Sequence, residues 1–308
     1  MPVVSVGNLT VGGTGKTPCV EYLARRFREW DVRVAILSRG YGVEHGPNDE
    51  ALVLEENLPD VPHLQGRDRA ALAATAVEEL ESEVLILDDG FQHRRLGRDF
   101  DMVLVDATNP WGFGRLLPRG LLREPISSLR RADAILITRS DQAPDKEVAA
   151  IMSRIRRECP ESPIVATSHR PLGWLRHGHG EAPAELLRGR PVAAFCGLGN
   201  PDAFRRSLTA IGCDVRDFRT FPDHHPYSCS DIDELRRWAD SMPAETALAT
   251  TQKDLVKLRT AMIGTHELWA LRIGMHIHHD AEAERLEQRI KDQVALRALS
   301  ARQEPESN

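Results

Sequence analysis

The sequence predicts an α/β protein, with a mostly parallel sheet covered by helices on both faces and a smaller C-terminal α/β unit. In the first half, short β-branched runs alternate with helical patterns, which is typical of βαβ units and a buried parallel sheet. The same alternation starts again after a stretch rich in glycine and proline at residues 167–190. A length of 308 residues suits one large or two medium domains.

Hydrophobic periodicity places the individual elements of the first half. After Thr17, apolar side chains recur at i, i+3, i+4 and i+7, so a helix with one buried stripe is expected to begin there. An alanine-rich helix is expected at 69–80. The expected strands are 3–6, 32–37, 84–87, 102–105 and 134–138. Residues 1–166 should therefore form the core domain.

The second half is expected to form a separate, smaller unit. Residues 167–190 are interpreted as a linker or small ribbon, 191–300 as the C-terminal α/β domain and 301–308 as a frayed tail. Helices should start near Pro201 and Asp231, and a final helix should cover about 281–299. The expected strands are 192–196, 215–218, 247–251 and 268–273.

Composition excludes several classes of protein. The net charge is −6, hydrophobic residues make up 41% and charged residues 28%, so disorder, collagen and coiled coil are excluded for most of the chain. There is no basic excess, and we expect no nucleic-acid partner. The five cysteines are scattered without a C-x-x-C pair, which favours reduced thiols in the cytoplasm. No apolar run approaches the roughly 20 residues of a membrane span, and the N-terminus does not resemble a signal peptide.

The strongest motif is a glycine-rich loop between the first strand and the first helix. Glycines let backbone N–H groups converge on phosphate oxygens, and the helix N-terminus adds partial positive charge. Lys16 can reach the β- and γ-phosphates, and the Thr17 hydroxyl can hold Mg²⁺. The predicted nucleotide-binding residues are Thr10, Val11, Gly12, Gly13, Thr14, Gly15, Lys16 and Thr17. The pattern predicts a P-loop NTPase-type fold, and by itself it does not distinguish a kinase, an ATPase and a GTPase.

Two carboxylates follow the strand at 84–87. Asp88 and Asp89 come at the carboxyl end of a parallel strand, the edge of the sheet at which ligands bind. Carboxylate oxygens are ligands that Mg²⁺ prefers. We therefore predict that Asp88 and Asp89, with Thr17, form a Mg²⁺ site.

The segment at 109–125 mixes large apolar side chains with arginines. Such a pattern suits a surface that meets acyl chains and anionic head groups. It also fits a loop with leucines packed in the core and arginines in water. A guanine-recognition motif is not evident, because Thr251-Gln252-Lys253-Asp254 has its residues out of order.

Six ordered motifs together resemble the tetraacyldisaccharide 4′-kinase family, the lipid A 4′-kinases of Gram-negative bacteria. The similarity runs from about residue 3 to about residue 275. The motifs are Val6-Gly7-Asn8-Leu9-Thr10 with the loop to Pro18, Ser38-Arg39-Gly40-Tyr41-Gly42, Leu87-Asp88-Asp89-Gly90-Phe91-Gln92-His93-Arg94, Leu117-Pro118-Arg119-Gly120 with Leu122-Arg123-Glu124-Pro125, Phe221-Pro222-Asp223-His224, and Lys253-Asp254-Leu255-Val256-Lys257-Leu258.

The resemblance implies a lipid kinase of lipid A biosynthesis, with ATP as its cofactor. It would transfer the ATP γ-phosphoryl group to the 4′-hydroxyl of a tetraacylated glucosamine disaccharide 1-phosphate, on the cytoplasmic side of the inner membrane and without a protein partner. The family's carboxylate and histidine correspond to Asp49 and His224, which with Lys16 are the predicted catalytic residues. An Asp tuned by a His is a suitable base for a sugar hydroxyl. The implied substrate-side residues are Arg39, His93, Arg119, Arg123 and Glu124, with Glu50 near the metal.

Other interpretations compete with the lipid kinase. A regulatory or metal-chaperone NTPase has the same phosphate loop, and a soluble small-molecule kinase would keep the base but not the apolar segment. His276, His278 and His279 lie close together in sequence, so a metal site there is a further hypothesis. The family usually begins with an apolar helix that docks on the membrane, whereas six residues precede Gly7 here. Three explanations stay open: the true start lies upstream, the sequence is truncated, or this member attaches to the membrane peripherally through other surfaces. The protein as written is expected to be either soluble or peripherally attached.

Overall fold

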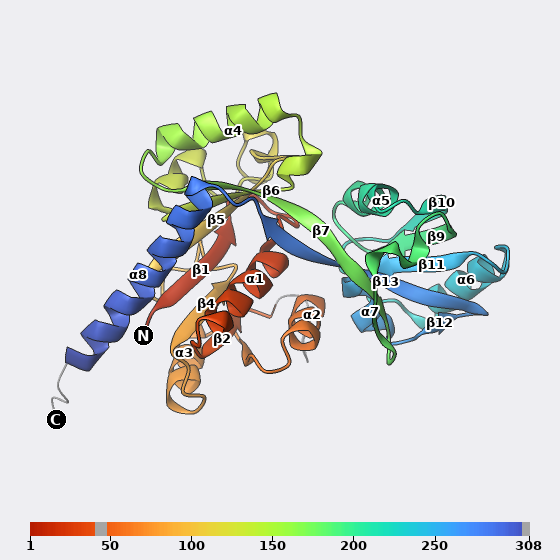
Figure 1. Ribbon diagram of the computed structural model, residues 1–308, viewed down its shortest axis with the longest axis horizontal. Helices are drawn as coiled ribbons and strands as arrows, with labels where there is room; N and C mark the ends of the chain where they lie inside the picture. The colour runs from red at the N-terminus through yellow and green to blue at the C-terminus, as the bar shows by residue number, and fades with distance from the viewer. Residues whose placement is uncertain (41–47, 304–308) are drawn as a thin grey trace. The chain divides into compact units, whose positions relative to one another are not determined.

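The computed structural model describes residues 1–40 and 48–303, with side chains up to residue 295. The chain forms two compact units (Figure 1). The larger unit contains Met1–Asn48, Leu54–His169 and Met275–Asn308, and the smaller contains Asp49–Val53 and Arg170–Gly274. The smaller unit differs from the domain expected at 191–300 in three ways. It begins at Arg170, it includes the early segment Asp49–Val53, and it ends at Gly274, because the residues from Met275 onward belong to the larger unit.

A parallel sheet forms the centre of the larger unit. Its strand order is β7-β6-β5-β1-β4-β2-β3, and every pair of neighbours is parallel. All the carboxyl ends of these strands therefore meet at one edge. The strands are β1 (Val3–Asn8), β2 (Val34–Ser38), β3 (His63–Gln65), β4 (Val84–Asp88), β5 (Phe100–Asp106), β6 (Ala134–Thr138) and β7 (Ile164–Arg176), whose later residues belong to the smaller unit.

Helices cover both faces of this sheet, as the sequence predicts. Successive strand residues point to opposite faces, and the core follows that alternation. Val4 and Val6 pack with α1 (Lys16–Glu29) and α8 (Ala281–Gln303), while Val3 packs with α3 (Arg69–Glu78). The helix α4 (Asp145–Glu158) and the 3₁₀ helix η2 (Ile126–Arg131) pack on the same face as α3, farther along the sheet. The larger unit also contains the 3₁₀ helices η1 (Gly112–Gly114) and η3 (Ser140–Gln142).

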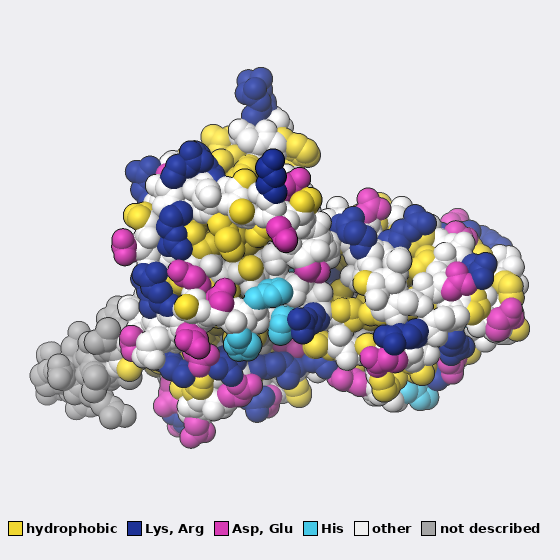
Figure 2. Space-filling view, turned by 45° about the horizontal axis from the view of Figure 1, so that its top comes forward, with side chains coloured by type: hydrophobic (Ala, Val, Ile, Leu, Met, Phe, Trp, Pro, Cys, Tyr) yellow, Lys and Arg dark blue, Asp and Glu magenta, His cyan; other side chains and the backbone are white. Residues whose placement is uncertain are grey.

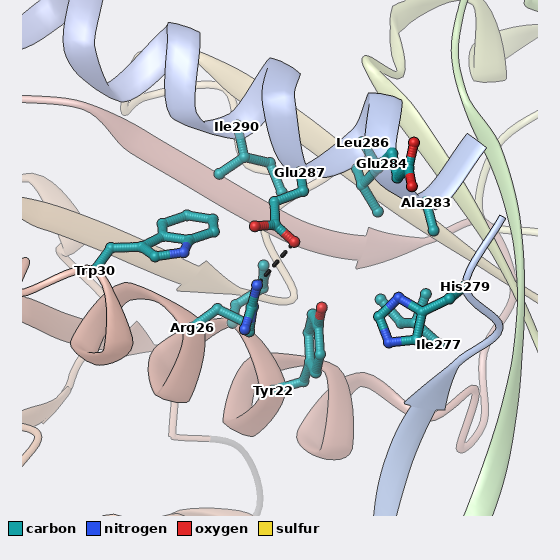
Figure 3. Close-up of a pocket in the computed structure, with 11 residues that line it drawn as sticks. Tyr22, Arg26, Trp30, Ile277, His279, Ala283, Glu284, Leu286, Glu287 and Ile290 are labelled. Carbon is teal, nitrogen blue, oxygen red and sulfur yellow. Dashed lines mark hydrogen bonds and ion pairs between the residues drawn. The ribbon is translucent and has the colours of Figure 1, made fainter. Parts of the chain in front are cut away.

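The C-terminal helix α8 belongs to the larger unit rather than to the smaller domain expected from the sequence. Its Leu286 and Ile290 are buried in the same cluster as α1. Arg26 Nη2 of α1 lies 2.8 Å from Glu287 Oε2 of α8, beside a small pocket between the two helices (Figure 3). The apolar stripe of α8 therefore completes one face of the larger core. Of the frayed tail expected at 301–308, residues 301–303 belong to the helix α8, and residues 304–308 lie outside the described residues.

The smaller unit is a second layered α/β structure. Its sheet runs β10-β9-β11-β13-β7, with β8 antiparallel to β7 and β12 antiparallel to β13. Two buried clusters lie on opposite faces of this sheet. The consecutive β9 residues Ala193 and Ala194 belong to different clusters, because successive strand residues point to opposite faces. Its elements are β8 (Gly180–Ala182), η4 (Ala184–Leu187), β9 (Pro191–Cys196), α5 (Pro201–Ala210), β10 (Asp214–Thr220), α6 (Cys229–Asp240), β11 (Ala247–Thr251), α7 (Gln252–Leu258), β12 (Met262–Ile263) and β13 (His266–Ile277).

Residues 167–190, expected as a linker or small ribbon, consist mainly of ordered strand. The pairing of β7 with β8 makes this stretch an antiparallel ribbon. The sequence does not predict the helix α2 (Asp49–Asn57), which follows the residues outside the described range. Asp49 and Glu50 in its first turn favour a helix start, because carboxylates interact well with the helix N-terminus.

Candidate active site

The phosphate loop connects β1 to α1, and two of its glycines have left-handed backbone conformations. Gly12 has a φ of +110° and Gly15 a φ of +90°, conformations that L side chains rarely adopt. Gly15 caps α1 without any side-chain hydrogen bond, and the first turn of α1 has no acidic residue. By contrast, side chains cap other helices: Asp68 on α3, Asn200 on α5, Ser228 on α6 and Thr251 on α7. The start of α1 is therefore suited to an external anion.

Lys16, the first residue of α1, lies in a network of polar side chains. Its Nζ is 3.5 Å from Asn8 Oδ1 and 3.5 Å from Asp89 Oδ1. Arg123 Nη1 donates to both oxygens of Asp89 at 2.9 Å. Burial alone would raise the pKa of Asp89, but Lys16 and Arg123 outweigh it and hold that pKa below its usual value. Asp89 is therefore ionised at neutral pH. Arg123 belongs to the same polar network as Lys16, because both contact Asp89.

Asp88 and Thr17 supply a carboxylate and a hydroxyl at the same edge of the sheet. Asp88 is the buried last residue of β4 and pairs in register with Val6 of β1. Thr17 is buried in the first turn of α1. Both are oxygen donors of the kind that Mg²⁺ prefers, so the residues of the predicted metal site are chemically suited to that ion.

The remaining predicted residues of the larger unit have varied surroundings. Arg39 is exposed directly after β2, and Arg119 is exposed on the 109–125 segment. Glu124 lies 2.9 Å from Arg131; burial would raise its pKa, but the hydrogen bond and charge of Arg131 lower it. His93 follows β4, and its pKa is lowered by burial and then by the charge of Arg69. His93 is therefore neutral at pH 7. Tyr41 and Gly42 of the second motif lie outside the described residues.

Three further residues contact the phosphate loop and were not predicted from the sequence. Thr138 Oγ1 donates to Thr14 O at 2.9 Å, and Arg139 Nη2 donates to Gly13 O at 2.8 Å. His169 Nε2 would lie 2.7 Å from a Cβ added at Gly15. Burial lowers the pKa of His169 to about 3, so its ring is neutral. Thr138 and His169 belong to adjacent parallel strands, β6 and β7, which run in the same direction as β1. That arrangement is the signal that could have indicated them.

The 109–125 segment is attached to the phosphate loop by backbone hydrogen bonds. Val11 N donates to Leu121 O at 2.8 Å, and Arg123 N donates to Leu9 O at 2.7 Å. Leu122 is buried in the same cluster as Leu9. Leu122 therefore packs in the core, as one of the two interpretations of this segment expects, while residues 113–119 are all exposed.

The smaller unit contains the Asp49–His224 pair. His224 Nδ1 lies 2.9 Å from Asp49 Oδ1 and 3.0 Å from Oδ2, although the two residues are 175 positions apart. Asp49 is buried, whereas the His224 side chain is about half exposed at 54%. The structure thus brings together the two residues proposed as catalytic, and it leaves the histidine accessible.

Two lysines of α7, Lys253 and Lys257, lie around this pair, and neither was predicted as a site residue from the sequence. Lys257 Nζ is 3.7 Å from Asp49 Oδ2 and 3.2 Å from Asp254 Oδ1, and Lys253 Nζ is 2.6 Å from Glu50 Oε1. Both lysines belong to a motif that carried the family resemblance. Their contacts could not be predicted, because their partners come from a distant segment.

The charges around Asp49 set its ionisation. Burial alone would raise its pKa, but the hydrogen bond with His224 and the charges of Lys253 and Lys257 outweigh burial, and the pKa is lowered. The same hydrogen bond raises the pKa of His224 against the opposing effect of burial. Asp49 is therefore an anion at neutral pH, held against a histidine that retains its proton to higher pH than usual.

Two other features bear on metal and membrane. In the described part of the chain, no group of three or more His, Cys, Asp or Glu side chains is arranged to hold a metal ion. The rings of His276 and His278 meet edge to face at 5.5 Å. None of the helices within residues 1–40 and 48–303 combines the length and the hydropathy of a membrane span.

The parallel sheet and the uncapped phosphate loop define a P-loop NTPase-type protein. A family model described as tetraacyldisaccharide-1-P 4′-kinase matches residues 1–294. The chain therefore belongs to the tetraacyldisaccharide 4′-kinase family. The match confirms the predicted family and its kinase activity, in preference to a regulatory NTPase or a small-molecule kinase.

Individual relatives agree with this membership. The tetraacyldisaccharide 4′-kinase of Anaeromyxobacter sp. (strain Fw109-5) is 42% identical over 298 residues, which cover 90% of this chain and 79% of the relative. That of Syntrophus aciditrophicus is 40% identical over 287 residues, covering 83% and 75%. The crystal structure of LpxK from Aquifex aeolicus in complex with ATP superposes with a TM-score of 0.70 at 34% identity, covering 94% of this chain and 88% of that one. This likeness confirms the P-loop NTPase-type fold.

Proposed function

We propose that this kinase transfers the γ-phosphoryl group of ATP to the 4′-hydroxyl of a tetraacylated glucosamine disaccharide 1-phosphate, using Mg²⁺, at the cytoplasmic side of the inner membrane. Family membership supports the acceptor. The observation that carries the residue assignments is the hydrogen bond between Asp49 and His224.

The phosphate loop binds the nucleotide. The N–H groups at the start of α1 receive the phosphates, because Gly15 caps the helix without a side-chain hydrogen bond and the first turn has no acidic residue. Lys16 neutralises negative charge on the β- and γ-phosphates. In this structure its Nζ contacts Asn8 and Asp89. Arg139 donates a hydrogen bond to Gly13 O and so restrains the phosphate loop at Gly13.

Thr17, Asp88 and Asp89 would hold Mg²⁺. When bound, the ion supplies positive charge to the phosphate oxygens during transfer. Asp89 is already ionised and balanced by two cations, so it can serve as a ligand or as an acceptor for metal-bound water. Asp88 and Thr17 are buried and therefore have restricted side-chain conformations.

Asp49 acts as the base for the sugar hydroxyl. Its carboxylate accepts the proton as the oxygen attacks phosphorus, because a hydroxyl becomes strongly acidic only as that bond forms. His224 orients the carboxylate through its Nδ1 hydrogen bond, which also raises the pKa of the histidine. Lys257, 3.7 Å away, keeps Asp49 ionised before the transfer.

The acceptor lipid would be recognised by basic side chains. Arg119 is exposed and is the candidate ligand for the 1-phosphate. Arg123 keeps that role only as an alternative, because its guanidinium contacts Asp89. Arg39, His93 and Glu124 remain predicted contacts on the substrate side.

The test incubates the protein with γ-labelled ATP, Mg²⁺ and the disaccharide lipid in detergent. Label on the lipid, lost in Asp49→Asn and retained in a matched Asp223→Asn variant, supports the proposal. Asp223 lies beside His224 but 3.9 Å from its Nε2, so it controls for local charge. Label released only as free phosphate, whether or not lipid is present, would instead indicate an NTPase.

A further inference from the structure

The tip of the 109–125 segment, residues 113–119, displays an unusual concentration of apolar surface. Phe113 is 75% exposed, Leu116 47% and Leu117 49%. Within the described residues the other exposed large hydrophobic side chains are Val77, Leu80, Leu172 and Met262, which lie on other segments. Isolated exposed apolar residues are ordinary, whereas three within five positions mark an interaction surface.

The charge of this segment has one sign. Between Asp106 and Glu124 the sequence contains three arginines and no acidic residue. Arg123 contacts Asp89, while Arg115 and Arg119 are exposed at the tip beside the apolar side chains. Hydrophobic and basic side chains border one another along the upper margin of the view in Figure 2. The tip therefore matches a surface that is both apolar and anionic.

The backbone holds this tip in a fixed conformation. Leu117 N donates to Leu122 O at 2.9 Å, and Leu122 N donates to Arg115 O at 3.1 Å. Phe113 has a φ of +64°, a conformation that large side chains avoid unless their surroundings impose it. The exposed apolar side chains are thus presented by an ordered loop, and the residues Leu121 and Arg123 that follow it are hydrogen-bonded to Val11 and Leu9.

We propose that residues 113–119 form a membrane wedge, which inserts Phe113, Leu116 and Leu117 into the interface of an anionic bilayer while Arg115 and Arg119 contact lipid phosphates. The proposal rests on the proposed function in one respect: a tetraacylated acceptor resides in a membrane. Charge complementarity selects the bilayer as partner, because anionic head groups lie directly above apolar chains. A few apolar side chains give weak binding alone, so both components are needed.

The first experiment measures co-sedimentation of the full chain with phosphatidylcholine vesicles, with and without phosphatidylglycerol and without the acceptor lipid. Wild type should bind the anionic vesicles more tightly. The Phe113→Ser/Leu117→Ser double variant should lose about tenfold or more in affinity for both vesicle types, because two side chains no longer transfer from water. Arg115→Gln should lose about fivefold for the anionic vesicles alone.

A control variant replaces two exposed apolar side chains elsewhere on the larger unit. Val77 and Leu80 are 43% and 38% exposed, so Val77→Ser/Leu80→Ser should bind vesicles like wild type. Unchanged thermal unfolding midpoints show that the variants are folded. Phe113→Trp adds a fluorophore at the tip, which lipids brominated in the acyl chain should quench, whereas Val77→Trp should not be quenched by them.

Equal losses in both double variants, or binding that requires the acceptor lipid in the vesicle, would overturn the wedge. Wild-type protein that binds neither vesicle type would also overturn it. Failure of the wedge leaves phosphorylation of detergent-solubilised lipid intact, and failure of the proposed function leaves vesicle binding intact, so the two results are distinguishable.

Discussion

Alanine replacements in the phosphate loop separate backbone strain from crowding, because its glycines differ in their surroundings. A Cβ added at Gly13 or Gly12 would meet no atom within 4 Å, but only Gly12 has a positive φ, of +110°. At Gly15 φ is +90° and the added Cβ would lie 2.7 Å from His169 Nε2. Gly13→Ala thus introduces neither effect, Gly12→Ala introduces strain, and Gly15→Ala introduces both.

The expected stabilities follow from these differences. A left-handed backbone costs an L residue about 1–2 kcal/mol, whereas alanine in a compatible conformation gains about 0.4–1 kcal/mol through the unfolded state. Gly13→Ala should therefore unfold at the wild-type temperature or slightly above it. Gly12→Ala should lose about 1–2 kcal/mol, or roughly 2–8 °C in a unit of this size. Gly15→Ala should lose more, because the His169 ring or the loop must move.

Thermal unfolding of the nucleotide-free protein, followed by circular dichroism, measures this series. Adding His169→Ala to Gly15→Ala should recover the excess loss and leave the strain, with His169→Ala alone as control. The reasoning is refuted if Gly15→Ala is no less stable than Gly12→Ala, or if the second substitution recovers nothing. ATP affinity adds a second measurement. The stable Gly13→Ala variant should still bind ATP more weakly, because its methyl group would fill open space that the bound phosphates are proposed to occupy.

Three further predictions concern the smaller unit. Asp49→Asn should lower kcat by about 10²–10⁴-fold with little change in KM for ATP in steady-state assays; a comparable rise in KM would contradict its role as base. Hydrogen bonding to Asp49 raises the pKa of His224 against the opposing effect of burial. Its NMR titration midpoint should therefore exceed the ordinary value and fall in Asp49→Asn. The stability that this proton adds is complete below about pH 6.5 and is lost as pH rises through the folded-state pKa. Asp254→Ala should cost about 3–5 kcal/mol in urea unfolding, because its buried carboxylate accepts from Thr251 Oγ1 at 2.6 Å and pairs with Lys257 at 3.2 Å; a loss below about 1 kcal/mol would show that the lysine is solvated.

Local features of the fold were predictable from the sequence. The strand at 134–138 is recovered with the same bounds as β6, because a fully buried parallel strand is a continuous apolar run between polar residues. The phosphate loop is equally local, since its strand, glycines and lysine are consecutive. The final helix was also predicted, but its membership of the larger unit was not, because an apolar stripe does not specify which core it joins.

Contacts between distant segments could not be predicted in the same way. The pairing of Asp49 with His224 was proposed only through family resemblance, since nothing in either segment alone specifies its partner. Lys257 and His169 were missed because their significance comes from Asp49 and Gly15, which lie far from them in sequence. Periodicity identifies the elements, whereas the site depends on which strand ends and helix starts the topology brings together.

The assignment of Asp49–Val53 to the smaller unit has a consequence for modular rearrangement. A gene fragment that encoded residues 170–274 alone would supply His224 and Lys257 without the carboxylate that both contact. Exchange of this unit between relatives must therefore carry along five residues encoded more than a hundred codons upstream, or the recombinant would inherit His224 and Lys257 without the carboxylate that they share.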